Sequence, residues 1–302
     1  MSTVTSPESA PARSGALLPG LLSAVRPRQW LKNVLVLAAP LASGLLGTAD
    51  VLLGSILAFV AFSLAASGIY LINDVHDIEA DRAHPKKRFR AIAAGIVPPS
   101  VAVAVAIVLF AGALAVAAVA SWPLVIVVAV YEAVQLSYCF WLKHQPVIDI
   151  CIVSSGFLMR AIAGGAASGI PLSQWFLLVA GFGSLFMVSG KRYAEFVMAE
   201  QTGAQIRRSL HGYSASYLRF VWTASAALLI MTYALWSFQM RQVSGSVWPV
   251  ISMVPFVVAV LRYAVDVDGG KAGEPEEIAL SDRVLQILGV AWLAALAAGV
   301  YF

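Results

Sequence analysis

The sequence predicts an all-α, polytopic membrane protein with nine transmembrane helices. Of its 302 residues, 60% are hydrophobic and only 12% are charged, and the mean hydropathy is +0.83. A soluble domain carries about 25% charged residues. Apolar stretches such as residues 101–120 lack the two-residue alternation of membrane β-strands, which excludes a β-barrel. Because one helical crossing takes about 20 residues, nine crossings account for the apolar excess.

Nine apolar stretches define the expected helices in chain order: residues 31–48, 51–72, 97–119, 122–141, 147–168, 174–190, 215–239, 247–265 and 283–302. The first is the least regular, because Pro40 and two glycines interrupt it. Ahead of it, residues 1–25 are expected to form a disordered or interfacial tail, since their apolar part is too short to cross a bilayer. Residues 26–302 then form a single transmembrane domain.

The positions of the 20 Lys and Arg residues predict the orientation. With the N-terminus in the cytoplasm, Arg160 and Arg219 lie in or at the edge of spans, and Arg241 alone falls in an outer loop. All other basic residues are cytoplasmic, as the positive-inside rule requires. The C-terminus is therefore expected outside. The long loops at 73–96 and 191–214 face the cytoplasm, and long polar loops usually carry function.

Net charge and cysteine content narrow the class of partner. The net charge of +4 suits membrane lipids or anionic substrates, and nothing in the sequence predicts a nucleic-acid partner. The two cysteines, Cys139 and Cys151, fall inside apolar stretches. Their positions favour small buried residues over a disulfide or a zinc site.

An acidic string follows the second predicted span. If the helix continues through it, Asn73, Asp74, Asp77 and Asp81 lie along one face. Carboxylates so arranged repel each other, and a bound divalent cation would remove that penalty. Hard oxygen ligands without cysteine indicate Mg²⁺, which is often shared with substrate phosphates.

A cationic stretch comes directly after the acidic string: Arg82, His84, Lys86, Lys87, Arg88 and Arg90. Carboxylates for magnesium beside cations for phosphate are typical of a diphosphate-binding site. For any single one of these basic residues, a general role as a positive-inside anchor is an equally good interpretation.

The pattern Asn73-Asp74-x-x-Asp77-x-x-x-Asp81 resembles the signature of the UbiA superfamily of intramembrane prenyltransferases. The resemblance implies an all-helical enzyme that holds a diphosphate leaving group with magnesium at the cytoplasmic membrane face. In that family a second acidic motif, Asp-x-x-x-Asp, follows the sixth helix. This chain departs from it, because Lys191 replaces the first acid and Glu195 remains.

Further strings resemble the polyprenyl-phosphate phosphoribosyltransferase branch of that superfamily: RPRQWLKN at 26–33, Tyr138 with Lys143, Asp149, MRAIAG at 159–164 and Lys191-Arg192. This branch implies transfer of 5-phosphoribosyl from 5-phosphoribosyl 1-diphosphate to polyprenyl (decaprenyl) phosphate. Diphosphate leaves, and the anomeric carbon is inverted. The resemblance further implies a catalytic domain over 26–302 in the plasma membrane and a product used for cell-wall arabinan, and a homo-oligomer is compatible with it.

The resemblance and the residue chemistry together give candidate roles. The candidate catalytic residues are Asp77, Asp81 and Glu195. The candidate magnesium ligands are Asn73, Asp74, Asp77 and Asp81. The donor is expected at Asn73, Lys86, Arg88, Lys191 and Arg192. The lipid phosphate is expected at Arg28, Lys32, Asn33 and Lys143.

Three ionisable residues fall within predicted spans, where charge is costly and usually paired. Glu132 and Arg160 lie near mid-depth of neighbouring spans, so we expect a buried structural pair between them. A role in the lipid cavity is the alternative. Asp149 and Arg160 share a helix face without touching.

Two other functions compete with this interpretation. A prenyltransferase with a prenyl diphosphate donor and an aromatic acceptor would share the fold and the metal, but loss of the second acidic motif argues against it. A transporter of an anionic lipid would carry charged residues on both membrane sides, whereas the outer loops here are almost uncharged.

Overall fold

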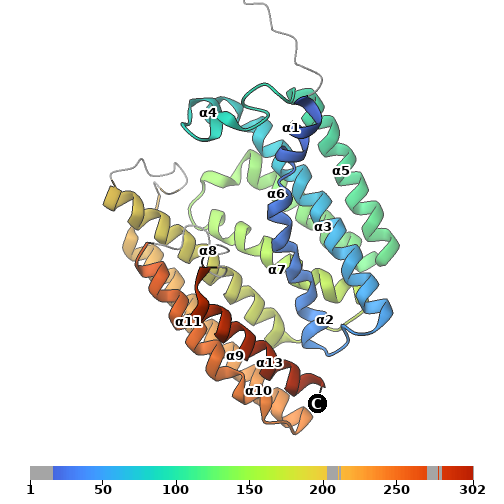
Figure 1. Cartoon of the computed structure of the whole chain (residues 1–302), viewed down its shortest axis with the longest axis vertical. Helices are drawn as coiled ribbons and strands as arrows, with labels where there is room; N and C mark the ends of the chain where they lie inside the picture. Colours follow the sequence, from blue (N-terminus) through green and yellow to red (C-terminus); the bar gives the residue numbers. More distant parts are fainter. Residues whose placement is uncertain (1–15, 203–209, 211, 271–277, 279–280, 302) are drawn as a thin grey trace, which may run out of the picture.

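The computed structural model describes residues 16–202, 210, 212–270, 278 and 281–301, and within them it is entirely helical. Figure 1 shows long helices packed side by side. In chain order the elements are α1 (Leu17–Ala24), the 3₁₀ segment η2 (Pro27–Leu37), α2 (Ala38–Ala42), α3 (Ala49–His76), α4 (Ile78–Ala83), η3 (Lys87–Phe89), α5 (Pro99–Ala120), α6 (Trp122–Phe140), η4 (Leu142–His144), α7 (Ile148–Ser168), α8 (Gln174–Thr202), α9 (Ala215–Ser244), α10 (Trp248–Ile251), α11 (Met253–Asp268) and α13 (Arg283–Tyr301).

Among the described residues, 6 helices are long and apolar enough to cross a membrane, so the chain is a multi-pass membrane protein. They are Ala49–His76, Pro99–Ala120, Trp122–Phe140, Ile148–Ser168, Ala215–Ser244 and Trp248–Asp268. Each coincides with an expected span. The other three expected spans fall on η2 with α2, on α8 and on α13, so six of the nine meet the length and apolarity of a crossing.

The first expected span, at 31–48, is not a regular α-helix. Residues 27–37 form the 3₁₀ segment η2, and α2 adds only 5 residues before the chain turns at Ser43. A 3₁₀ helix rises about 2.0 Å per residue, so η2 reaches further than an α-helix of the same length. It lies against α3 and α7 (Figure 1).

Glycine explains why η2 lies so near α7. A Cβ at Gly164 would come within 1.8 Å of the Val36 carbonyl oxygen. Only a residue without a side chain permits such an approach of two backbones. Close packing through small residues is the usual way in which membrane helices associate.

The N-terminal tail expected at 1–25 is partly helical, because Leu17–Ala24 form α1. Leu17, Leu21 and Ala24 pack on a small apolar cluster with residues of α3, α5 and the 91–97 turn. These eight residues are therefore ordered, which leaves the interfacial alternative as the prediction for this part of the tail. Residues 1–15 lie outside the described part of the chain.

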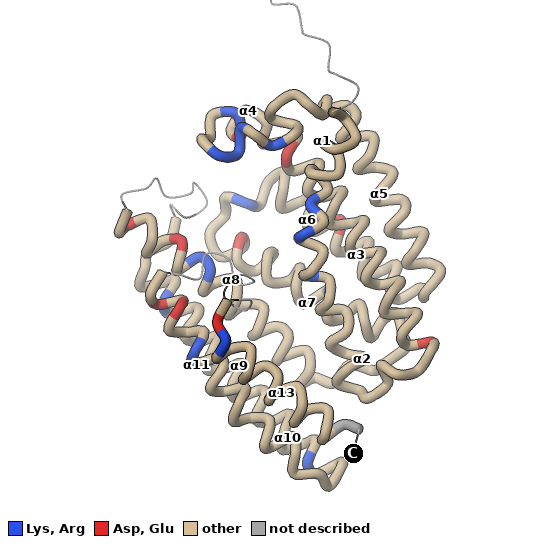
Figure 2. Tube along the Cα trace, viewed as in Figure 1, with Lys and Arg blue, Asp and Glu red and all other residues tan. Residues whose placement is uncertain are grey.

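Two larger apolar cores hold the helices together. One joins α3, α5, α6 and α7, and the other joins α8, α9 and α11. Figure 2 shows that charged residues gather at the end of the molecule that carries α4 and along the C-terminal part of α8. The opposite end, with α2 and α10, carries few of them. The polar chemistry is thus concentrated toward one end of the bundle.

Candidate functional site

The acidic motif lies where α3 gives way to α4. The expected continuous helix is interrupted, because α3 ends at His76 and Asp77 has a non-helical ψ of 12°. Hydrogen bonds nevertheless cross the break: the Asp77 N–H donates to the Asn73 carbonyl at 2.9 Å, and the Asp81 N–H donates to the Asp77 carbonyl at 2.8 Å. Asp74 and Asp81 therefore both face inward and are 3% and 2% exposed.

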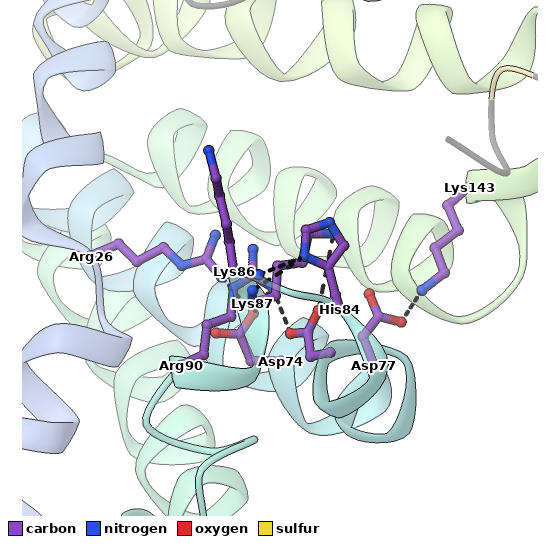
Figure 3. Close-up of polar contacts among 9 residues, drawn as sticks. Arg26, Asp74, Asp77, His84, Lys86, Lys87, Arg90 and Lys143 are labelled. Atoms are coloured by element: carbon purple, nitrogen blue, oxygen red, sulfur yellow. Dashed lines mark hydrogen bonds and ion pairs between the residues drawn. The ribbon is translucent and has the colours of Figure 1, made fainter. Parts of the chain in front are cut away.

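Each of the three aspartates is paired with a cation (Figure 3). Arg26 Nη2 lies 2.5 Å from Asp74 Oδ1. Arg90 Nη1 bridges two carboxylates, 3.2 Å from Asp74 Oδ1 and 2.6 Å from Asp81 Oδ2. Lys143 forms an ion pair with Asp77 across the bundle. The repulsion predicted for the acidic face is thus removed by side chains of this chain.

These ion pairs affect how the acidic motif can bind a magnesium ion. Carboxylate and amide oxygens are the ligand type that Mg²⁺ prefers, so the donor set of Asn73, Asp74, Asp77 and Asp81 fits in kind. In the described part of the chain, however, no three His, Cys, Asp or Glu side chains converge as a metal site. Arg26, Arg90 and Lys143 therefore compete with magnesium for these carboxylates.

Sequence reasoning gave Arg26 and Arg90 no individual role, although Arg90 belongs to the predicted cationic stretch and Arg26 to the string at 26–33. Arg26 has φ 53°, a left-handed conformation that is unusual for a non-glycine residue and disfavoured before proline. Its guanidinium also lies over the Tyr70 ring, 4.7 Å from the centroid. Backbone strain tends to be retained at functional sites. The sequence feature that could have indicated Arg26 was its position before Pro27, ahead of the first expected span.

The four residues expected at the lipid phosphate have different environments. Arg28 is exposed, and the Lys32 ammonium lies 5.9 Å from the Phe157 ring centroid. Asn33 is fully buried, so it does not lie at an exposed interface. Lys143 belongs instead with Asp77.

The buried Asn33 is part of a polar contact between η2, α3 and α7. Its amide donates to Ser63 Oγ at 2.9 Å and accepts a hydrogen bond from Arg160 Nε at 2.7 Å. Arg160 further donates to the Gly156 carbonyl and to the Tyr131 hydroxyl. The expected Glu132–Arg160 pair was wrong, because the rotation of α6 presents Tyr131 to the guanidinium. In the described structure Glu132 Oε1 is buried without a hydrogen-bond partner.

A second polar cluster joins α6, α7 and α8. Asp149 Oδ1 accepts hydrogen bonds from the Tyr138 hydroxyl at 2.6 Å and from Arg192 Nη2 at 3.1 Å. Arg192 Nη1 also lies 3.3 Å from Glu195 Oε2. Burial alone would lower the Arg192 pKa, but the nearby Asp149 and Glu195 carboxylates raise it above its usual value. Arg192 therefore stays charged and forms ion pairs with Asp149 and Glu195.

The remaining donor candidates lie toward solvent. Lys86 and Arg88 are exposed, and the Arg88 guanidinium stacks on Phe89, 4.8 Å from the ring centroid. Lys191 is half-buried beside the second cluster. The cations thus form two groups. One surrounds the acidic motif and includes Lys143, which comes from the turn between α6 and α7, and the other lies on α8.

Comparison with known proteins decides the family. Residues 33–281, most of the chain, match the UbiA prenyltransferase family. The chain belongs to the UbiA family. This confirms the family that the acidic signature indicated. The structure of a UbiA homolog from Archaeoglobus fulgidus, bound to DMAPP and Mg²⁺, superposes with a TM-score of 0.70 at 16% identity. The match covers 93% of this chain and 99% of that one, so the two share a fold.

Two relatives within the UbiA family are much more similar in sequence. The chain is 58% identical to the decaprenyl-phosphate phosphoribosyltransferase of Mycolicibacterium smegmatis, covering 100% of this chain and 98% of the relative. It is 59% identical to the protein of the same name from Mycobacterium tuberculosis, covering 95% of this chain and 96% of the relative. Both relatives match across nearly their full length.

Proposed function

We propose that this UbiA-family protein is a decaprenyl-phosphate phosphoribosyltransferase. It transfers 5-phosphoribosyl from 5-phosphoribosyl 1-diphosphate to decaprenyl phosphate and releases diphosphate. The observation that carries the proposal is the 58% identity to a protein of that name over 100% of this chain. The site supports it, because Arg26, Arg90 and Lys143 supply the positive charge that a phosphate-rich pair of substrates requires.

The reaction is a substitution at the anomeric carbon of the ribose. A lipid phosphate oxygen forms the new C–O bond on one face while the bond to the diphosphate breaks on the other, so the carbon is inverted. The acceptor phosphate is already anionic near neutral pH, so no strong base is needed. Catalysis then consists of alignment and of charge stabilisation on the leaving group.

The residues of the two polar clusters have different roles in this reaction. Asp77 and Asp81 would hold magnesium at the diphosphate end of the donor, with Asn73 and Asp74 as further ligands of the metal. When bound to these oxygens, magnesium supplies positive charge to the leaving diphosphate. Arg26, Arg90 and Lys143 can transfer their hydrogen bonds from carboxylate to phosphate as the donor arrives. Glu195 orients ribose hydroxyls. The exposed cations Lys86, Arg88 and Arg28 and the half-buried Lys32 attract the phosphates of donor and lipid.

The proposed topology places this site in the cytoplasm. Nine crossings with the N-terminus inside put the α3–α4 junction and the end of α8 on the same side of the membrane. The distribution of charge supports it, because the end of the bundle with α4 carries many basic residues while the other end carries few (Figure 2).

The test is transfer of label from radiolabelled 5-phosphoribosyl 1-diphosphate into extractable lipid by the purified protein. Decaprenyl phosphate is the acceptor, with and without Mg²⁺. We expect metal-dependent label in the lipid phase. If label appears only with a prenyl diphosphate donor and an aromatic acceptor, the fold stands and the proposed substrates are wrong.

A further inference from the structure

Asp149 is the innermost member of the second polar cluster. It lies in the first turn of α7, is fully buried and pairs with Arg192, which in turn contacts Glu195. The side chain of Asp149 is 1% exposed and that of Glu195 is 20% exposed. Tyr138, Asp149, Arg192 and Glu195, here called the Asp149 network, thus lead from the interior to the partly open surface of α8.

The hydrogen bonding of the Asp149 network is incomplete, and this costs free energy that a purely structural contact would not need to lose. Tyr138 and Arg192 both bond to Oδ1, and in the described structure Asp149 Oδ2 and Arg192 Nε are buried without partners. A bidentate arrangement would satisfy both atoms. Unsatisfied buried polar atoms are uncommon in native proteins because each carries an uncompensated loss of hydration.

Backbone strain lies two residues from Asp149. Val147 has φ 69°, which is a rare conformation for a β-branched residue. It is held there by its N–H, which donates to the Tyr213 hydroxyl at 2.6 Å. Strain of this kind persists where the surrounding structure needs one particular orientation. The strained turn fixes the orientation of the first turn of α7, which carries Asp149.

We propose that Asp149 is a positioning residue for the phosphoribosyl donor. It holds Arg192, and through Arg192 it sets the Glu195 carboxylate that accepts hydrogen bonds from the ribose hydroxyls. The inference rests on the proposed function. It also assigns a reason for the changed second motif: a prenyl diphosphate has no ribose hydroxyls, whereas a sugar donor needs an acceptor held in place beside the anomeric carbon.

The test is a set of steady-state measurements on the full-length protein with varied donor and varied acceptor. Asp149→Asn preserves size and an oxygen for Tyr138 but removes the charge that holds Arg192. We expect the donor KM to rise by about tenfold or more while the decaprenyl phosphate KM stays within about twofold. An equal loss against both substrates, or no change in donor KM, would overturn the proposal.

A double-mutant cycle separates positioning from independent binding. If Asp149 acts through Glu195, then the Asp149→Asn, Glu195→Gln double variant has about the same donor KM as Glu195→Gln alone. Additive effects would contradict this. Asp268→Asn is the matched control, since Asp268, at the end of α11, pairs with Arg219 and accepts a hydrogen bond from Tyr193, which follows Arg192 in α8 and is not part of the network. Its donor KM should be unchanged.

A milder variant covers the case in which Asp149→Asn does not fold. Tyr138→Phe removes only one hydroxyl from the network, and we expect a donor-specific rise in KM of about threefold; an unchanged KM overturns the proposal. The parent protein separates the two hypotheses. Absence of phosphoribosyl transfer by the parent refutes the proposed function, whereas transfer by the parent with an unaltered Asp149→Asn variant refutes positioning alone.

Discussion

Arg90, directly after η3, and Asp81, within α4, form an ion pair of 2.6 Å. The same guanidinium nitrogen lies 3.2 Å from Asp74, so one arginine joins the two buried carboxylates of the acidic motif. Arginine suits this task because its charge is permanent and its donors are fixed in a plane. The arginine thereby holds the two carboxylates beside each other.

Replacing Arg90 by Gln should damage both folding and activity. Loss of one partner of a buried ion pair costs about 3–5 kcal/mol, and we expect less here because the Arg90 side chain is 29% exposed. Thermal unfolding in detergent measures the loss. The control is Arg241→Gln, at an exposed residue in the last turn of α9, and this variant should unfold like the parent. Equal stability of both variants would show that the bridge contributes nothing.

Asp77→Asn should abolish transfer and leave the protein folded. Asp77 is the least buried of the three aspartates, with 27% of its side chain exposed, so losing its pair with Lys143 is tolerated. Loss of the carboxylate should lower kcat by at least about 100-fold, because it acts on developing charge. The exposed Glu79 of the same motif provides the control: Glu79→Gln should keep parental activity. Full activity of Asp77→Asn would remove it from the site.

Lys191→Asp should impair use of the phosphoribosyl donor. The change restores an acid four residues before Glu195 and adds negative charge beside Arg192, where a phosphate-bearing donor is expected. We expect donor KM to increase by about tenfold, measured with saturating lipid acceptor. An unchanged donor KM would place Lys191 outside the donor site.

Magnesium alone should stabilise the protein little, because Asp74, Asp77 and Asp81 already have cationic partners. Magnesium with inorganic diphosphate should raise the melting temperature, since the diphosphate draws Arg26, Arg90 and Lys143 away from the carboxylates and a bound ligand stabilises the folded state. Chelation with EDTA should reverse the shift and stop transfer. A large shift with magnesium alone would show that the carboxylates converge without substrate.

Gly164→Ala should destabilise the contact between η2 and α7. The added Cβ would lie 1.8 Å from the Val36 carbonyl oxygen, and two backbones must separate to admit it. Overpacking of this kind costs about 1–3 kcal/mol or more. Gly181→Ala in α8 is the matched control, because no atom lies within 4 Å of the added Cβ. It should be neutral or stabilising by up to about 1 kcal/mol. Equal melting temperatures would contradict the close packing.

The sequence by itself determined the fold class, the UbiA family and the place of the acidic chemistry. Hydropathy and charge are properties of contiguous residues, so the apolar spans and the acidic motif at 73–81 could be predicted without knowing any long-range contact. The departure at Lys191 was visible for the same reason. The ends of α3, α5, α6 and α7 were predicted closely because each of these helices is one continuous apolar stretch of sequence.

Only the tertiary structure decided which charges meet. Arg26 is 48 residues from Asp74, and Arg160 is 127 residues from Asn33. Such pairs depend on how each helix is rotated and how deeply it lies, which composition does not specify. A rotation of one residue exchanged Glu132 for Tyr131 as the partner of Arg160. The close approach of η2 to α7 has the same origin, because it depends on Gly164 lying opposite the Val36 carbonyl.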